Sequence, residues 1–161
     1  MLPCGGGEHG AAVRELVFAL EFRGRAGPVA GSTTLRQARS SAPSQAHRTV
    51  IGVDGIESRM DGLAGEDAVL ESRVERFADG TFVEDGRITY GRAGAITFET
   101  LGRGHVGPAP QPGWVRGGIV WTVTGGDGHL AGAEGLITSC FAVGPDGLVI
   151  DHHWTRLYLP L

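Results

Sequence analysis

Hydrophobic and polar residues alternate along most of the chain with a period of two, which predicts β-strands rather than helices. The first run, residues 13–22, places four large apolar side chains on one face: Leu16, Phe18, Leu20 and Phe22. From residue 49 onward, β-branched and aromatic runs recur about every ten residues. These later runs are Thr49–Met60, Val69–Phe77, Phe82–Tyr90, Ala95–Leu101, Gly117–Thr124, Leu136–Val143 and Leu148–Leu159. The pattern therefore predicts an all-β domain of about eight strands.

Turn-forming residues separate these runs. They are Asp61-Gly62, Asp79-Gly80, residues 91–94 and residues 145–147, and they tolerate the positive φ angles of tight hairpins. Consecutive hairpins give an antiparallel up-and-down order, and about eight such strands close into a small barrel without exposed edges. A β-sandwich is the alternative architecture. The barrel is favoured because several runs lack a clean apolar face, and the interior of a small barrel accepts polar and aromatic side chains.

Two segments fall outside the strand pattern. Residues 24–48 are rich in Ser, Ala, Arg and Pro without a clear period, and a helix over residues 33–41 would have only a thin apolar face. Loops of this length are usually functional or disordered, so we expect a mobile excursion, with a lid over an active site as the alternative. Residues 1–12 are Gly-rich and expected to be flexible. The barrel domain is thus predicted to cover residues 13–161.

Composition and charge remove several classes of function. All 14 basic residues are arginine, which excludes a lysine Schiff base or a lysine general base. The formal net charge of −4, without a basic run, disfavours nucleic-acid binding. Cys4 and Cys140 lie far apart, so neither a zinc site nor a disulfide framework is expected. The first residues lack a signal-peptide pattern, and no apolar run reaches about 20 residues. We therefore expect a cytoplasmic protein without a metal, a cofactor or a membrane partner.

One glycine-rich stretch carries a family pattern. Residues 124–135 read TGGDGHLAGAEG between two late strands, and this stretch resembles the GGTGxFxGAxG segment of the allene oxide cyclase and dirigent superfamily. Two positions depart from that pattern: Asp127 replaces a small hydroxyl residue and Leu130 replaces an aromatic one. In physical terms, Gly125 and Gly126 would end a strand, and a short helical turn would place Leu130 as a plug at the barrel end. The small residues up to Gly135 would let the next strand pack closely.

The resemblance implies an allene oxide cyclase-like barrel and a set of related activities. Enzymes of the superfamily cyclise an unstable epoxide, dirigent members steer radical coupling without redox chemistry of their own, and related bacterial barrels are polyketide cyclases. The implied setting is bacterial secondary metabolism, and the arginine-, alanine- and glycine-rich composition is typical of a GC-rich genome. The resemblance covers about a dozen residues that serve structure, so no catalytic residue carries over from it.

The final run supplies the candidate catalytic residues. His152, Arg156 and Tyr158 share one face of the strand with Trp154, and we expect this face to line the barrel lumen. His152 would act as an acid or base, and Arg156 would stabilise developing negative charge on a carbonyl oxygen. The alternatives are a structural histidine and a buried ion pair. The partner of Arg156 would then be Glu71, Glu75 or Glu99.

Further residues are candidates for binding a substrate. Trp121, Trp154 and Tyr90 could form the aromatic walls of a pocket, although core packing explains them equally well. Glu99 and Arg73 could supply polar contacts inside the lumen. The triplets at residues 57–59 and 71–73 both read Glu-Ser-Arg, which is typical of cross-strand ion pairs if the two strands form a hairpin.

Three hypotheses for function remain. The first is a cofactor-free cyclase or isomerase that folds a small apolar intermediate into one reactive conformer. The second is a non-catalytic, dirigent-like protein that binds a small hydrophobic ligand in the same pocket. The third is a structural or partner-binding barrel with a filled interior. A homo-oligomer, either a dimer or a trimer, is compatible with all three.

Overall fold

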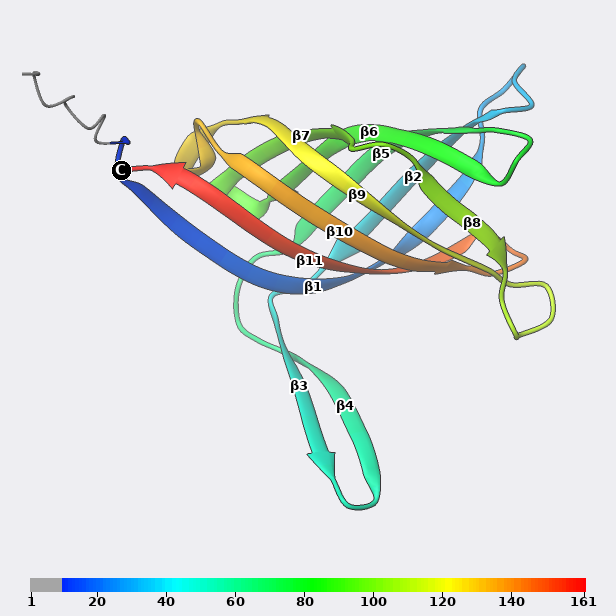
Figure 1. Ribbon diagram of the computed structural model, residues 1–161, viewed down its shortest axis with the longest axis horizontal. Helices are drawn as coiled ribbons and strands as arrows, with labels where there is room; N and C mark the ends of the chain where they lie inside the picture. Colours follow the sequence, from blue (N-terminus) through cyan, green and yellow to red (C-terminus); the bar gives the residue numbers. More distant parts are fainter. Residues whose placement is uncertain (1–9) are drawn as a thin grey trace, which may run out of the picture.

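A closed antiparallel barrel of eight strands dominates the computed structural model, which describes residues 10–161 (Figure 1). The barrel strands follow one another in chain order: β1 (Val13–Pro28), β2 (Leu35–Ala42), β5 (Ala68–Arg76), β6 (Thr81–Tyr90), β7 (Gly94–Thr100), β9 (Val115–Gly126), β10 (Glu134–Val143) and β11 (Leu148–Pro160). Strand β11 pairs back onto β1, from Val13 opposite Pro160 to Arg25 opposite Leu148. The predicted all-β, up-and-down barrel is confirmed. Most of the predicted flexible segment 1–12 lies outside the described residues.

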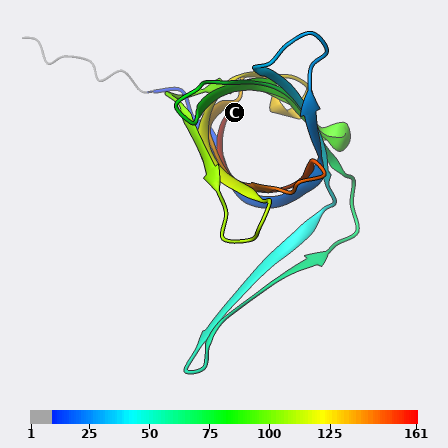
Figure 2. The same ribbon diagram turned by 90° about the vertical axis from the view of Figure 1, so that its right-hand side faces the viewer.

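Three smaller features complete the fold. Strands β3 (Gln45–Gly52) and β4 (Gly55–Gly62) form a separate hairpin that stands away from the barrel in both views (Figures 1 and 2). Strand β8 (Gly104–Pro108) pairs with β9 and, at two positions, with β6. The 3₁₀ turns η1 (Gly91–Ala93) and η2 (Gly128–Leu130) lie at the opposite end of the barrel. We call the two ends the β8 end and the η2 end.

The prediction of a mobile excursion over residues 24–48 is wrong, and so is the alternative of a lid. Strand β1 continues to Pro28, and β2 pairs with both β1 and β5 as a full member of the barrel. The inward positions of β2 are Arg36, Ala38, Ser40 and Ala42. Because these side chains are small or polar, the apolar period that marks the other strands is missing here.

The predicted strand over residues 49–60 is also wrong, because the chain turns at Val53-Asp54 and forms β3 and β4 instead. As a result, the Glu-Ser-Arg triplets at 57–59 and 71–73 do not face each other. Strand β4 pairs only with β3, whereas β5 pairs with β2 and β6. The exposed Glu71 carboxylate instead accepts a hydrogen bond from Arg39 on β2.

Aromatic and branched side chains fill the middle of the lumen. Trp121 is fully buried and stacks on Phe98 with ring centroids 4.2 Å apart. Phe22 packs on the ring of His153 at 4.3 Å, and Leu157 closes the layer between them and the η2 end. The alternation predicted for β1 is confirmed, because its Leu and Phe side chains point inward. The centre of the barrel is therefore a packed core rather than an open channel.

The glycine-rich stretch adopts the geometry expected from its residues. Strand β9 ends at Gly126, η2 follows, and Leu130 is buried in the core at the barrel end. A Cβ atom on Gly126 would lie 2.2 Å from the Leu130 carbonyl oxygen, so only glycine fits there. The carboxylate of Asp127 accepts hydrogen bonds from the Ala95 amide and the Arg87 guanidinium, both at 2.8 Å. This residue thus ties the turn to β7 and β6.

Candidate functional site

The predicted catalytic face of β11 lies on the outside of the barrel. Burial alternates strictly along the strand, and the inward residues include Asp151, His153 and Thr155. His152 faces outward, where its Nε2 atom lies 2.9 Å from a carboxylate oxygen of Glu21, and Arg156 pairs with Glu15 on the exposed surface. Tyr158 is exposed on the same face. The expected lumenal position of these three residues is therefore wrong. From the sequence, either face of β11 could be the inner one. In the structure, the inner face carries Val149, Leu157 and Leu159.

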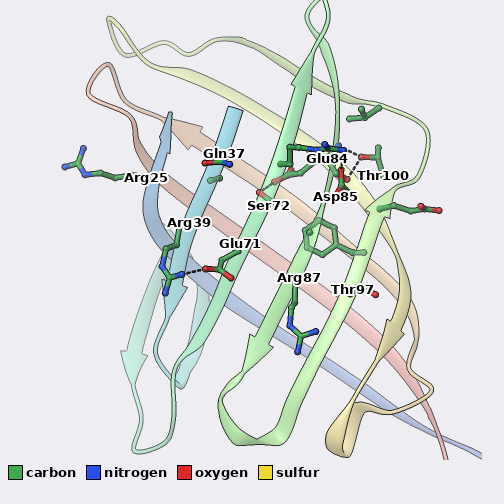
Figure 3. Close-up of a pocket in the computed structure, with 16 residues that line it drawn as sticks. Arg25, Gln37, Arg39, Glu71, Ser72, Glu84, Asp85, Arg87, Thr97 and Thr100 are labelled. Atoms are coloured by element: carbon green, nitrogen blue, oxygen red, sulfur yellow. Dashed lines mark hydrogen bonds and ion pairs between the residues drawn. The ribbon is translucent and has the colours of Figure 1, made fainter. Parts of the chain in front are cut away.

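The predicted substrate-binding residues divide between the inside and the outside of the barrel. Trp121 and Tyr90 point inward, whereas the Trp154 side chain is 57% exposed. Arg73 and Glu99 lie in a shallow, open depression of about 1290 Å³ on β2, β5, β6 and β7 (Figure 3). Two ion pairs lie within this depression, Arg39 with Glu71 and Arg73 with Asp85 at 3.6 Å. Exposed pairs of this kind contribute little stability, and the depression resembles an ordinary solvated surface.

A hydrogen-bonded polar cluster lies inside the lumen instead. The Asp151 carboxylate accepts a hydrogen bond from the Ser139 hydroxyl at 2.7 Å, and its other oxygen lies 2.8 Å from Nε2 of His153. All three side chains are buried. Because Asp151 sits between the serine and the histidine, His153 cannot take a proton from Ser139, and the arrangement is not that of a serine hydrolase. The Nδ1 atom of His153 has no hydrogen-bond partner among the described residues.

A second buried acid, Glu84, faces the lumen from β6. Its carboxylate accepts a hydrogen bond of 2.6 Å from the Ser72 hydroxyl of the neighbouring strand β5. The backbone of Glu84 is fixed by Thr100, whose hydroxyl accepts from the Glu84 amide at 2.6 Å and donates to its carbonyl at 2.8 Å (Figure 3). Strand and side chain are thus both held in place, so the carboxyl group has a defined position.

The surroundings of Glu84 favour its neutral form. Burial, together with the negative charges of Asp151 and Asp85, raises the pKa of Glu84 to about 8, against the lowering effect of the Ser72 hydrogen bond. At neutral pH most molecules therefore carry a protonated Glu84 that can donate a proton. A carboxylic acid with a pKa close to the working pH suits general acid–base catalysis.

A cavity of about 60 Å³ connects Glu84 with the β8 end of the barrel. Its polar lining consists of Arg36, Ser40, Arg76, Glu84 and Asp151, and its apolar lining includes Phe82, Phe141 and Val106. Arg36 and Arg76 lie on adjacent strands with their side chains on the inner face. Within residues 10–161, neither guanidinium has a carboxylate within 4.0 Å. Burial and the nearby charge of Arg36 lower the pKa of Arg76. We call this arrangement the mouth site.

A second, apolar pocket opens through the barrel wall near the η2 end. Strand β2 leaves the barrel after Ala42, so the first half of β1 lacks a neighbour on that side. The side-chain amide of Gln45 partly replaces the missing strand, because it accepts a hydrogen bond from the Glu21 amide at 2.8 Å. The pocket has a volume of about 340 Å³ and is lined by Phe18, Leu20 and Tyr90, among others. Burial raises the pKa of the Tyr90 hydroxyl.

The mouth site combines the features that acid–base chemistry requires. It offers a proton donor in Glu84, two cationic side chains that can bind an oxygen anion, and an apolar wall that limits contact with water. No group of His, Cys, Asp and Glu residues in the described part of the chain has the arrangement of a metal site. Between residues 10 and 161, no helix has the length and hydropathy needed to cross a membrane.

The sequence contained a signal for Glu84, but the candidate site was placed on one face of β11 instead. Glu84 shares its face of the β6 run with Phe82, Ile88 and Tyr90, so an acidic residue interrupts an otherwise apolar inner face. A charged side chain in that position indicates either a functional group or a buried hydrogen bond. Arg36 gave no comparable signal, because its strand was not recognised.

Comparisons of this chain with family models, with curated proteins and with solved structures find no match. Membership of the allene oxide cyclase and dirigent superfamily therefore stays a prediction that depends on residues 124–135.

Proposed function

We propose that this barrel is a cofactor-free isomerase or cyclase that acts on a small, mainly apolar intermediate with a carbonyl or carboxylate group. The observation that carries the proposal is the mouth site, where a carboxylic acid with a pKa of about 8 lines the same cavity as two arginines without carboxylate partners among the described residues. The reaction takes place at the β8 end rather than on the outer face of β11. The resemblance of residues 124–135 to a superfamily that includes cyclases supports the same class of activity.

The roles of the residues follow from their chemistry. Arg36 and Arg76 bind the substrate oxygen and stabilise the negative charge that develops on it. Glu84 donates a proton to one carbon or oxygen atom of the substrate and, once ionised, removes a proton from another. The two transfers leave the enzyme unchanged, so an isomerisation needs no cofactor. Phe82 and Phe141 hold the apolar part of the substrate in one conformer.

The size of the cavity limits what enters it. A volume of about 60 Å³ accommodates a few water-sized groups, whereas pockets for whole ligands usually exceed about 300 Å³. The reacting group thus occupies the cavity, and the remainder of the substrate extends past the arginines through the mouth. Movement of Arg36 and Arg76 widens this opening, because no ion pair within residues 10–161 holds either side chain.

A second candidate function is non-catalytic binding, in the manner of a dirigent protein. The small volume of the mouth site favours this alternative, because it suits recognition of an anionic end group alone. The pocket near Tyr90, with about 340 Å³, has the size of a site for a small apolar molecule. In this alternative Glu84 contributes to the shape and polarity of the lumen without transferring a proton.

The two functions are separated by an assay of binding and turnover on the same variants. Purified protein is incubated with a panel of epoxides, unsaturated ketones and short β-diketones, and products are followed by NMR. An enzyme of the proposed kind loses at least about 100-fold in turnover in Glu84→Gln, and also in Arg36→Gln/Arg76→Gln. The matched control is Glu99→Gln, which removes an exposed carboxylate from the adjacent strand β7.

The pH profile gives an independent criterion. If protonated Glu84 is required, turnover decreases as the pH rises above about 8. Ligand binding without turnover, unchanged in Glu84→Gln, would establish the binder instead. Turnover that survives in the double arginine variant would refute the assignment of the mouth site.

A further inference from the structure

The β3–β4 hairpin is the one part of the described chain that extends away from the barrel (Figures 1 and 2). Each strand has eight residues, and the ladder runs from Gln45 opposite Gly62 to Gly52 opposite Gly55. An isolated two-stranded ribbon is at best marginally stable in water. Three large apolar residues near its tip are nevertheless exposed: Ile51 at 78%, Ile56 at 71% and Val53 at 100%. This hairpin, which we call the arm, therefore has the properties of a segment that is covered by a partner.

The two faces of the arm differ in character. Residues opposite each other in an antiparallel ladder project to the same side. One face carries Arg48, Glu57, Arg59 and Asp61, and Asp61 lies 2.8 Å from Arg59 and 3.7 Å from Arg48. The other face contains Ile51 opposite Ile56, Thr49 opposite Ser58 and His47 opposite Met60. This second side, which we call the neutral face, has no Arg, Asp or Glu side chain.

The outer surface of the barrel carries an apolar patch of its own. On β1, β10 and β11, the register aligns Val17, Arg156 and Leu136 in one row, with Trp154 in the next. Val17, Leu136 and Trp154 are all exposed large hydrophobic residues, and the only charged side chain among them, Arg156, is paired with Glu15. We call these three residues the barrel patch. The arm points away from the barrel, so the neutral face and the barrel patch do not meet within one chain.

We propose that two copies of this chain form a dimer by exchanging arms, with the neutral face of each arm seated on the barrel patch of the other copy. A two-fold axis makes the two contacts identical, and each copy then has both of its apolar surfaces covered. The arm is about 26 Å long and about 10 Å wide, which gives each face about 260 Å². Each contact covers about 260 Å² on the arm and a similar area on the barrel. Two reciprocal contacts therefore bury about 1,000 Å² in total, which reaches the size expected of a specific interface. This inference does not depend on the proposed chemistry of the mouth site.

The charges of the arm favour a protein partner over a lipid surface. Asp54 lies in the turn and Glu57 lies close to it on β4, so carboxylates flank the apolar tip. The whole chain has a formal net charge of −4. Insertion of this tip into an anionic bilayer would bring like charges together.

The test is the molar mass in solution, measured by sedimentation velocity and light scattering over a series of micromolar concentrations. The wild-type chain should have twice the mass of one chain. Ile51→Asp/Ile56→Asp changes the neutral face, and Trp154→Asp changes the barrel patch; each should yield a monomer. The matched control is Val50→Asp, which introduces the same charge on the opposite face of the same strand and should leave the dimer intact.

A further variant removes the arm by joining Gln45 to Gly62 through a short turn, since these two residues are already paired. Circular dichroism and thermal unfolding verify that each variant keeps its barrel, and the armless variant should be a folded monomer. A monomeric wild-type chain at every concentration would overturn the proposal, as would a dimer that persists in Ile51→Asp/Ile56→Asp. Flotation of the wild type with phosphatidylserine vesicles, abolished by the same double substitution, would assign the arm to a membrane instead.

Discussion

Replacing Glu84 with glutamine should make the barrel more stable at high pH, even though the substitution removes a hydrogen-bonded residue from the lumen. Glutamine has the shape of the protonated acid, and its carbonyl oxygen can accept the same hydrogen bond from Ser72. The substitution therefore resembles the form of Glu84 that the folded protein prefers. What it eliminates is the ionised form, which the lumen disfavours.

The direction of the effect follows from proton linkage. In the unfolded chain Glu84 loses its proton near pH 4.5, whereas in the folded barrel it keeps the proton up to about pH 8. The folded state thus binds more protons between these values, and the free energy of unfolding decreases as the pH rises through this window. The difference between 4.5 and about 8 corresponds to about 5 kcal/mol. Because solvent in the mouth screens part of the charge, we expect about 2 to 3 kcal/mol.

The assay is urea unfolding of both proteins at pH 5 to 9, followed by the fluorescence of the buried Trp121. Titrating groups that lie away from Glu84 are present in both proteins and cancel in the difference. At pH 5 the two free energies of unfolding should agree within about 1 kcal/mol, and at pH 9 the variant should exceed the wild type. Glu99→Gln serves as the control and should follow the wild-type curve. A constant difference between wild type and Glu84→Gln across this range would refute the reasoning.

Two further pairs of substitutions test the structure by comparing adjacent residues. Gly126→Ala should destabilise the barrel by about 1 to 3 kcal/mol, because its Cβ would lie 2.2 Å from the Leu130 carbonyl oxygen. Gly125→Ala, whose nearest contact is an ordinary 3.5 Å, should be close to neutral in the same thermal unfolding experiment. His153→Ala should cost about 3 to 5 kcal/mol, because it leaves a cavity and an unpaired buried carboxylate. His152→Ala should cost less than about 1 kcal/mol, since its partner Glu21 lies at the surface. Equal losses of stability for the two histidine variants in urea unfolding would contradict the assignment of the two faces of β11.

The alternation of side chains predicted most of the barrel but not which face of each strand is inside. In β1 the choice was clear, because Leu16, Phe18 and their neighbours mark a single apolar face. In β11 both faces carry polar and aromatic residues, and a shift by one position exchanges His152 for His153. The functional prediction was placed on the more polar and aromatic of the two faces. The ends of the strand, at Val149 and Leu159, indicate the inner face more reliably than the chemistry of its middle.

The parts that escaped prediction share a physical cause. Strand β2 fills a narrow part of the lumen with Ala38, Ser40 and Ala42, and small side chains leave no hydrophobic period in the sequence. The hairpin turn at residues 53–54 lies between apolar residues that are all exposed, so burial could not distinguish it from a continuous strand. The mouth site requires β2 and β5 to be neighbours, which only the closed barrel establishes.

The pairing of β1 with β11 determines when the barrel can form. Val13 lies opposite Pro160 and Arg25 lies opposite Leu148, so partners are separated by 147 and 123 residues along the chain. During synthesis, the edge of β1 that pairs with β11 stays unpaired until almost every other strand has left the ribosome. Contacts of such long range slow folding, because the chain must close a large loop before they stabilise it. The barrel should therefore close only once β11 has emerged, and the open intermediate, with two unpaired edges, is the state most exposed to aggregation and to chaperones.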